Sequence, residues 1–272
     1  MKIDPRAAIA PGAQLGAEVE VGPFAIIDEN VVIGDNCKIG PHVHLTGHTT
    51  IGANTKIHAG AVIGDAPQDL YYNGEVSFTD IGEDCVLREY VTIHRGTEEG
   101  SRTTVGKGVL MMAFSHLGHN CVIGDHVVIA NASLLAGRVE VGPRAFISAG
   151  VMIHQFVRVG RLAMIGGGNG IGQDIPPFCM LQNEQVQGPN VVGLRRAGLS
   201  ENARASIRQA IKLYFLFGLS RMGAIERIRA EVPPCPEVDE FIDFVLATKR
   251  GISPGRRLKT RTETAEAASE DA

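Results

Sequence analysis

Two histidines, His116 and His119, lie three positions apart in the segment FSHLGHNC at residues 114–121. No other pair of histidines in the chain has this spacing beside a glycine. The imidazole of histidine has an unperturbed pKa of about 6.5, so it can accept a proton at cellular pH. We therefore interpret His119 as a candidate general base whose position must be set by the surrounding elements.

A six-residue repeat predicts what those elements are. Every sixth residue from Ile3 to Ile171 gives 29 positions, and all but Asp69, Glu75 and Glu99 are aliphatic if methionine is counted. Neither the 3.6-residue period of a helix nor the alternation of a strand produces this pattern. It predicts a coil with three flat sides, in which one aliphatic residue per side points inward and parallel strands stack about 4.8 Å apart.

The repeat lapses twice, at residues 65–80 and 95–104, where the sequence is polar. Both lapses predict loops that leave the coil. Long excursions from a rigid scaffold are commonly functional. A family-specific bump or an oligomer contact is the alternative interpretation.

The repeat also divides the chain. Residues 1–180 are expected to form the β-helix, residues 181–251 a linker with a small α-helical domain, and residues 252–272 a disordered tail. The predicted fold class is therefore mainly β. The expected helices run from Ser200 to Gly218, from Ser220 to Glu231, and from Pro236 towards Gly251.

Composition excludes several classes of function. The net charge of -4 and the pI of about 6.1 give no basic signature, so no nucleic-acid partner is expected. No apolar run reaches the roughly 18 residues of a transmembrane segment. The five scattered cysteines form no C-x-x-C motif, and no signal peptide is evident. Reduced thiols in a cytoplasmic protein are the simplest interpretation.

The period of the coil places several polar residues on one face. Positions 18 apart are stacked on successive coils, so the sides that begin at Leu117, Leu135 and Ile153 lie above one another. These sides carry His119, Arg138 and His154, which are expected to rise along one face in steps of roughly 5 Å. Gly137 lies beside Arg138, where its backbone N–H could approach a ligand. This clustering predicts a site on that face. The other histidines are interpreted as outward or corner residues of the coil: His42, His44, His48, His58, His94 and His126.

Six segments resemble a known family: QDL at 68–70, TIHRGT at 92–97, HLGH at 116–119, LAG at 135–137, HQF at 154–156 and QDIPP at 173–177. Together they closely resemble the UDP-N-acetylglucosamine acyltransferases, from Met1 to about Gly251. TIHRGT and HQF are the most specific. The resemblance implies a left-handed parallel β-helix (hexapeptide repeat) with a C-terminal helical domain, assembled as a homotrimer with active sites between neighbouring subunits.

The resemblance also implies a reaction. A 3-hydroxyacyl chain would pass from acyl carrier protein to the 3-hydroxyl of UDP-N-acetylglucosamine, the first step of lipid A biosynthesis, with no metal or other cofactor. His119 matches the general base, Gly137 the backbone donor that stabilises the oxyanion, and Gly167 the position that limits acyl length. The implied substrate-binding positions are Asp69, His116, Arg138, His154, Gln155, Asn190, Arg195 and Arg196.

Departures from the family pattern leave alternatives open. Tyr71 stands where lysine is common, Arg138 where histidine is common and Asn120 where aspartate is common, and one guanidinium is shifted at Arg195-Arg196. The acceptor could instead be the 3-amino analogue of the sugar nucleotide, or the reaction a coenzyme A-dependent sugar acetylation. A non-catalytic hexapeptide scaffold is a further alternative. Zinc between subunits, as in gamma-class carbonic anhydrases, is a weaker one because Arg138 is a poor metal ligand.

Overall fold

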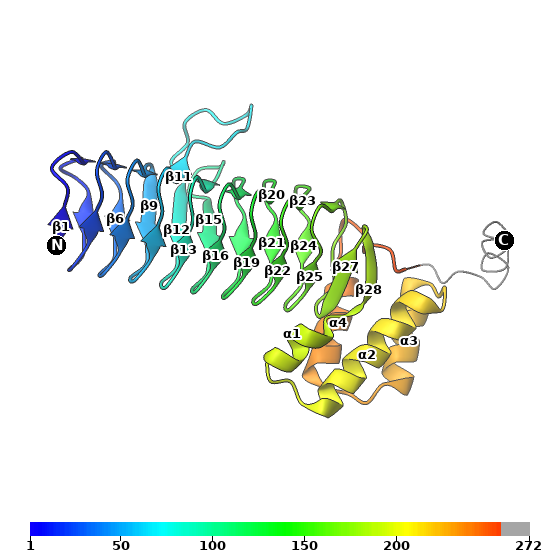
Figure 1. The fold of residues 1–272 in the computed structure, drawn as a ribbon. Coiled ribbons are helices and arrows are strands. Elements are labelled where there is room, and N and C mark those ends of the chain that lie inside the picture. The colour runs from blue at the N-terminus through cyan, green and yellow to red at the C-terminus, as the bar shows by residue number, and fades with distance from the viewer. Residues whose placement is uncertain (257–272) are drawn as a thin grey trace, which may run out of the picture.

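The computed structural model describes residues 1–256, in which a long three-sided coil carries a group of helices at its C-terminal end (Figure 1). Each side of the coil is one sheet, because each strand up to β23 pairs with the strand three further along the chain, while β27 pairs with β25 and β28 with β27. All of these pairings are parallel except that of the last two strands. The period-six prediction of a β-helix is confirmed.

Most strands are only two residues long because a corner follows each hexad. The first sheet holds β1 (Lys2–Ile3), β4 (Glu20–Val21), β7 (Lys38–Ile39), β10 (Lys56–Ile57), β13 (Val86–Leu87), β16 (Leu110–Met111), β19 (Val128–Ile129), β22 (Phe146–Ile147), β25 (Met164–Ile165), β27 (Cys179–Gln182) and β28 (Gln185–Pro189). The second holds β2 (Ala8–Ile9), β5 (Ile26–Ile27), β8 (His44–Leu45), β11 (Val62–Asp65), β14 (Thr92–His94), β17 (His116–Leu117), β20 (Leu134–Leu135), β23 (Met152–Ile153) and β26 (Gly170–Ile171). The third holds β3 (Gln14–Leu15), β6 (Val32–Ile33), β9 (His48–Ile51), β12 (Phe78–Ile81), β15 (Arg102–Val105), β18 (Val122–Ile123), β21 (Glu140–Val141) and β24 (Arg158–Val159).

The register of the sheets shows how two loops are inserted without disturbing the coil. Paired residues are normally 18 positions apart, as Leu117 and Leu135 are. The spacing is 30 between His48 and Phe78, across the first insertion, and 24 between Phe78 and Arg102, across the second. Because both spacings are multiples of six, the inward phase resumes after each loop.

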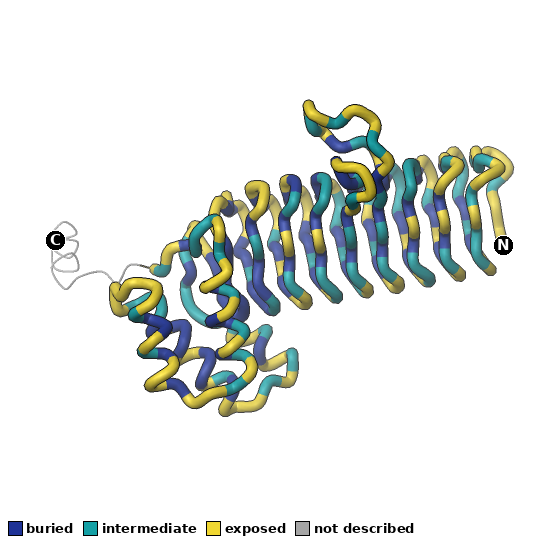
Figure 2. Tube along the Cα trace, turned by 180° about the vertical axis from the view of Figure 1, so that it is seen from behind, coloured by how far each residue is buried: buried dark blue, intermediate teal, exposed yellow. Residues whose placement is uncertain are grey.

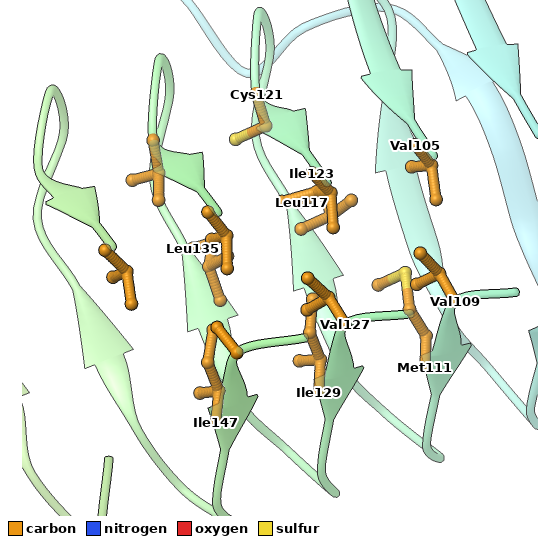
Figure 3. Packing of buried hydrophobic residues seen from close by; sticks show 14 of the residues in the cluster. Val105, Val109, Met111, Leu117, Cys121, Ile123, Val127, Ile129, Leu135 and Ile147 are labelled. Atoms are coloured by element: carbon orange, nitrogen blue, oxygen red, sulfur yellow. The ribbon is translucent and has the colours of Figure 1, made fainter. Parts of the chain in front are cut away.

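Two residues of each hexad point inward, where the sequence analysis expected one. Leu117 and Leu135 are fully buried, and so are Ser115 and Ser133 two positions before them. The large and the small side chain of each hexad fill the triangular section together, as the close packing of protein interiors requires (Figure 3). Cys121 occupies such a small inward position, and the chain's five cysteines are free.

The C-terminal end of the coil is covered by a hairpin and helices. Residues 181–251 were expected to begin with a linker, but β28 folds back antiparallel on β27. The turn between them places Asn183 and Glu184 at positive φ, which suits a tight hairpin. The short helix α1 (Val191–Arg196) follows and was not predicted.

The other three helices begin where their capping residues predict. Ser200 accepts a hydrogen bond from Ala203 N at the start of α2 (Glu201–Leu216), and Ser220 caps α3 (Arg221–Glu231) in the same way. α4 (Pro236–Leu246) begins with a proline, which suits the first turn. Within residues 1–256, no helix is both long and apolar enough to cross a membrane.

One buried carboxylate joins the last coil to the chain that follows α4. Asp174 is 1 % exposed and accepts hydrogen bonds from Arg158 N, Nε and Nη2 and from Thr248 Oγ1. The Arg158 guanidinium also lies 4.3 Å from the centroid of the Phe244 ring on α4. The tail was expected to begin at residue 252, but Ile252 pairs with Asp174. Residues 257–272 of that tail lie outside the described residues.

We expect Asp174→Ala to lower the free energy of unfolding by about 3 kcal/mol, because it leaves the partly buried Arg158 guanidinium without its partner. Thermal and urea unfolding would measure the loss. Asp80→Ala is the matched control, since the pair of Asp80 with Arg102 is about half-exposed and contributes at most about 1 kcal/mol. Equal effects of the two substitutions would contradict this role for Asp174.

Candidate active site

His119 lies at the corner that follows β17, with its ring against the next coil. Gly137 is opposite it, and a Cβ built on Gly137 would lie 2.3 Å from His119 Nε2. No other residue type fits there unless the imidazole moves. Among residues 1–256, Gly137 N–H has no hydrogen-bond acceptor. A free backbone donor therefore lies beside a histidine nitrogen.

The hydrogen bonds around Asn120 assign the proton on His119. Asn120 Oδ1 accepts from the backbone N of Thr97 at 3.1 Å and lies 2.8 Å from His119 Nδ1. A backbone N–H can only donate, so the Asn120 atom that faces both groups must be the oxygen. His119 Nδ1 then carries the hydrogen, and the lone pair is on Nε2. The tautomer suits a base that acts through Nε2.

A carboxylate from the first insertion faces that nitrogen. Asp69 Oδ2 lies 3.8 Å from His119 Nε2, and both side chains are mostly buried. Asp69 is held by its own turn, because its Oδ1 accepts from the backbone N of Tyr71 at 3.0 Å. Leu70 and Tyr71 of this loop are almost fully exposed. The loop projects from the coil, and much of its outer part is exposed (Figure 2). The insertion therefore contributes one inward acid and an apolar outer tip.

The two insertions brace each other. Arg95, at the start of the second, donates to the hydroxyl of Tyr72 in the first at 2.9 and 3.1 Å. Its guanidinium also donates to Gly64 O at 3.0 Å. Glu99 in turn accepts from the backbone N of Val76 at 2.9 Å. These bonds fix the loop that carries Asp69 relative to the coil that carries His119.

Two further histidines lie behind the site. His116 and His94 meet edge to face with ring centroids 4.9 Å apart, and Thr92 Oγ1 lies 2.7 Å from His116 Nδ1. Burial, and then the neighbouring His94, lower the pKa of His116 to about 4. Burial also lowers the pKa of His94, and the charge of His119 adds to this.

His94 is the residue that the sequence analysis missed. It was interpreted as an outward or corner residue, but it is only 7 % exposed and packs on His116. The signal was present, since His94 is the histidine of the specific TIHRGT segment. It packs on His116, three residues before the candidate base.

The remaining candidate residues are spread over several elements. Arg138 pairs with Glu98 and lies over the Phe156 ring. His154 and Gln155 are exposed on the following coil. No three His, Cys, Asp or Glu side chains within residues 1–256 are grouped in a way that could hold a metal ion.

The candidate residues near the C-terminal domain are not in contact with His119 in one chain. Asn190 caps α1, accepting from Gly193 N at 3.0 Å and donating to Leu162 O at 2.9 Å. Arg195 and Arg196 are exposed in the last turn of α1. Gly167 lies at an exposed corner, where an added Cβ would meet Ala149 O at 3.1 Å.

Comparison with known proteins gives consistent matches over most of the chain. Residues 174–253 match the family model described as UDP N-acetylglucosamine O-acyltransferase, domain 2, and residues 30–65 and 102–137 match the bacterial transferase hexapeptide model. The chain is 44 % identical over 254 residues to the acyl-[acyl-carrier-protein]–UDP-N-acetylglucosamine O-acyltransferase of Alkalilimnicola ehrlichii, covering 92 % of this chain and 98 % of the relative.

Solved structures of similar proteins agree with the fold. A UDP-N-acetylglucosamine acyltransferase from Bacteroides fragilis is 41 % identical with a TM-score of 0.89, covering 92 % of this chain and 98 % of that one. The corresponding protein of Acinetobacter baumannii is 36 % identical with a TM-score of 0.88, covering 92 % and 99 %. The β-helix is left-handed, which confirms the hand that the sequence resemblance implied.

Gly137→Ala should displace the His119 ring without unfolding the coil, because the added methyl group would overlap Nε2. Histidine ¹⁵N chemical shifts would report the displacement, and thermal unfolding would report the fold. Gly172→Ala is the control, since an added Cβ there meets nothing within 4 Å. The close contact would be refuted if both variants kept the wild-type shifts of His119.

His116 should make stability depend on pH. Its folded pKa of about 4 lies below the unfolded value, so the unfolded state binds a proton first as the pH falls. Stability is then complete above about pH 6.5 and falls by up to about 3 kcal/mol as the pH drops towards 4. Urea unfolding across this range should give a shallower dependence for His116→Gln than for wild type or the exposed control His154→Gln. Equal slopes in all three would contradict the expectation.

Proposed function

The chain belongs to the UDP-N-acetylglucosamine O-acyltransferase family, and we propose that it transfers a 3-hydroxyacyl chain from acyl carrier protein to the 3-hydroxyl of UDP-N-acetylglucosamine. This is the first step of lipid A biosynthesis. One observation carries the proposal for the site: His119 is held through Nδ1 by Asn120, while its free Nε2 faces Asp69 beside the unpaired N–H of Gly137.

The geometry supports a base-catalysed acyl transfer. His119 Nε2 would take the proton of the acceptor hydroxyl as its oxygen attacks the thioester carbonyl, a contribution of about 10²–10⁴ in rate. The resulting oxyanion would lie at Gly137 N–H, where one such donor is worth about 10²–10³. Collapse of the intermediate forms the ester and expels the carrier thiolate, which takes the proton back from the imidazolium.

We assign the substrate contacts by the same match. Asp69, beside Nε2, can orient the acceptor hydroxyl, while His116, His154 and Gln155 border the path along the face. Arg195 and Arg196 provide guanidinium groups suited to a diphosphate. The cytoplasm, where thiols stay reduced, is the compartment that we propose.

A homotrimer would bring the two halves of this site together. In one chain the insertion loops and α1 lie on opposite sides of the coil, as both views of the molecule agree (Figures 1 and 2). Arg195 and Arg196 of α1 could therefore reach His119 only from a neighbouring subunit. Gly167 stays our candidate for the end of the acyl chain, because its corner is exposed and carries no side chain.

The relatives' names favour the hydroxyl acceptor over its 3-amino analogue. The 3-amino analogue should be tested as well, because the chain departs from the family pattern at Tyr71, Arg138 and Asn120. Both acceptors would be offered with the 3-hydroxyacyl carrier protein as donor.

We expect wild-type protein to acylate UDP-N-acetylglucosamine, and His119→Ala to lose about 10²–10⁴ of kcat because the base is gone. Mass spectrometry of the product would identify the bond formed. His126→Ala, an exposed corner histidine outside the site, should keep full activity. Preference for the 3-amino analogue would overturn the hydroxyl assignment, and transfer to neither would overturn the function.

A further inference from the structure

Two consecutive residues of the second insertion hold opposite ends of one amide. The backbone N of Thr97 donates to Asn120 Oδ1 at 3.1 Å, while the carboxylate of Glu98 lies 3.4 Å from Asn120 Nδ2 and accepts from it. An amide that turned over would place a nitrogen against the Thr97 N–H and an oxygen against the carboxylate. Both changes are repulsive, so the insertion selects one orientation of Asn120.

Glu98 is itself anchored by the coil above. Its other carboxylate oxygen accepts a hydrogen bond from Arg138 Nη2, and the Arg138 guanidinium lies 5.6 Å from the centroid of the Phe156 ring. Asn120, Arg138 and Phe156 are 18 positions apart and all have positive φ, so they form one corner column of the β-helix. Glu98 reaches across from the insertion and joins two members of that column.

The Glu98–Arg138 pair has little to do with folding. The Glu98 side chain is 55 % exposed and that of Arg138 is 36 % exposed. Ion pairs at such exposed sites contribute little to stability. The pair matters for geometry instead. It fixes Glu98, Glu98 orients the Asn120 amide, and Asn120 Oδ1 determines which nitrogen of His119 carries the hydrogen.

We propose that Glu98, anchored by Arg138, is a positioning residue of the active site: it holds the Asn120 amide so that His119 keeps its proton on Nδ1 and its lone pair on Nε2. The inference rests on the proposed function for its catalytic consequence. It also assigns Arg138 to the support of the base, in place of the substrate contact expected from sequence.

Two substitutions at Glu98 separate its effect on the orientation of the Asn120 amide from the effect of its negative charge. Glu98→Ala removes the acceptor for Asn120 Nδ2 and should lower kcat about tenfold while KM changes little, because part of the population would hold the wrong tautomer. Glu98→Gln keeps an oxygen acceptor and should restore most of kcat. That rescue by the isosteric side chain would not follow from a merely structural role.

The pH profiles should then shift in opposite directions. Asp69, His94 and Asn120 surround His119 and are unchanged in these variants. Glu98→Gln leaves the Arg138 cation unpaired, which disfavours the imidazolium and moves the acid limb of kcat/KM to lower pH by about 0.5 to 1 unit. Arg138→Met leaves the Glu98 anion unpaired, and the limb should move to higher pH by a similar amount.

A second pair in the chain provides the matched control. Arg102 donates to Asp80 Oδ2 at 2.7 Å and lies 5.3 Å from the centroid of the Phe78 ring, so it repeats the Arg138 arrangement with a carboxylate that has no hydrogen bond to Asn120. Asp80→Asn and Arg102→Met should leave kcat, KM and the acid limb at their wild-type values. Equal shifts in the control pair would overturn the proposal, as would a change in KM alone.

Histidine ¹⁵N chemical shifts give a readout that does not need turnover. In [¹⁵N]histidine-labelled protein, His119 should show a protonated Nδ1 in wild type and a mixture of tautomers in Glu98→Ala. If wild type transferred no acyl chain but showed this pattern, the proposed function would fail and the positioning role would stand. An unchanged tautomer in Glu98→Ala would refute the positioning role whatever the activity.

Discussion

The stacking of inward side chains is the constraint on which the rest of the structure depends. Each hexad places one large aliphatic residue and one small residue inside, and neighbouring coils repeat the arrangement within hydrogen-bonding distance. No coil could bury its apolar side alone. Polar chemistry is thereby restricted to outward positions, corners and insertions. His119 lies beside a corner for this reason, and its partners come from a corner and from two loops.

Corner residues adopt backbone conformations that cost free energy, and two residues of the site lie at such corners. Asn120 and Arg138 both adopt positive φ, which asparagine tolerates and arginine does not favour. Holding a residue such as arginine there costs about 1 kcal/mol. Its contacts with Glu98 and Phe156 offset that cost, and the left-handed backbone turns the guanidinium out of the coil towards the insertion. Arg138, which stands where histidine is common in the family, is thus held by two contacts of its own, with Glu98 and with Phe156.

The coil could be predicted from its six-residue period. The same period explains why Gly137, 18 positions after His119, lies opposite it, although the sequence analysis placed Gly137 only beside Arg138. The contacts of Asp69 and Glu98 could not be predicted, since loop conformations obey no period. His94 was expected to face outward because the six-residue period gives no sign of the bulge that pairs it with Asp65. Its burial depends on that bulge. The hairpin of β27 and β28 was missed for a similar reason, as polar residues conceal a strand that covers the end of the core.

The hexad register also means that this molecule can change length only in discrete steps. The insertions lengthen the chain by whole hexads and return it to the same phase. Adding or removing one complete coil between His119 and the helices would leave every corner in register and alter their separation by one strand spacing, about 4.8 Å. The separation between His119 and the helices can therefore change during evolution only in fixed increments. Finer adjustment of the fit to a substrate must come from individual side chains.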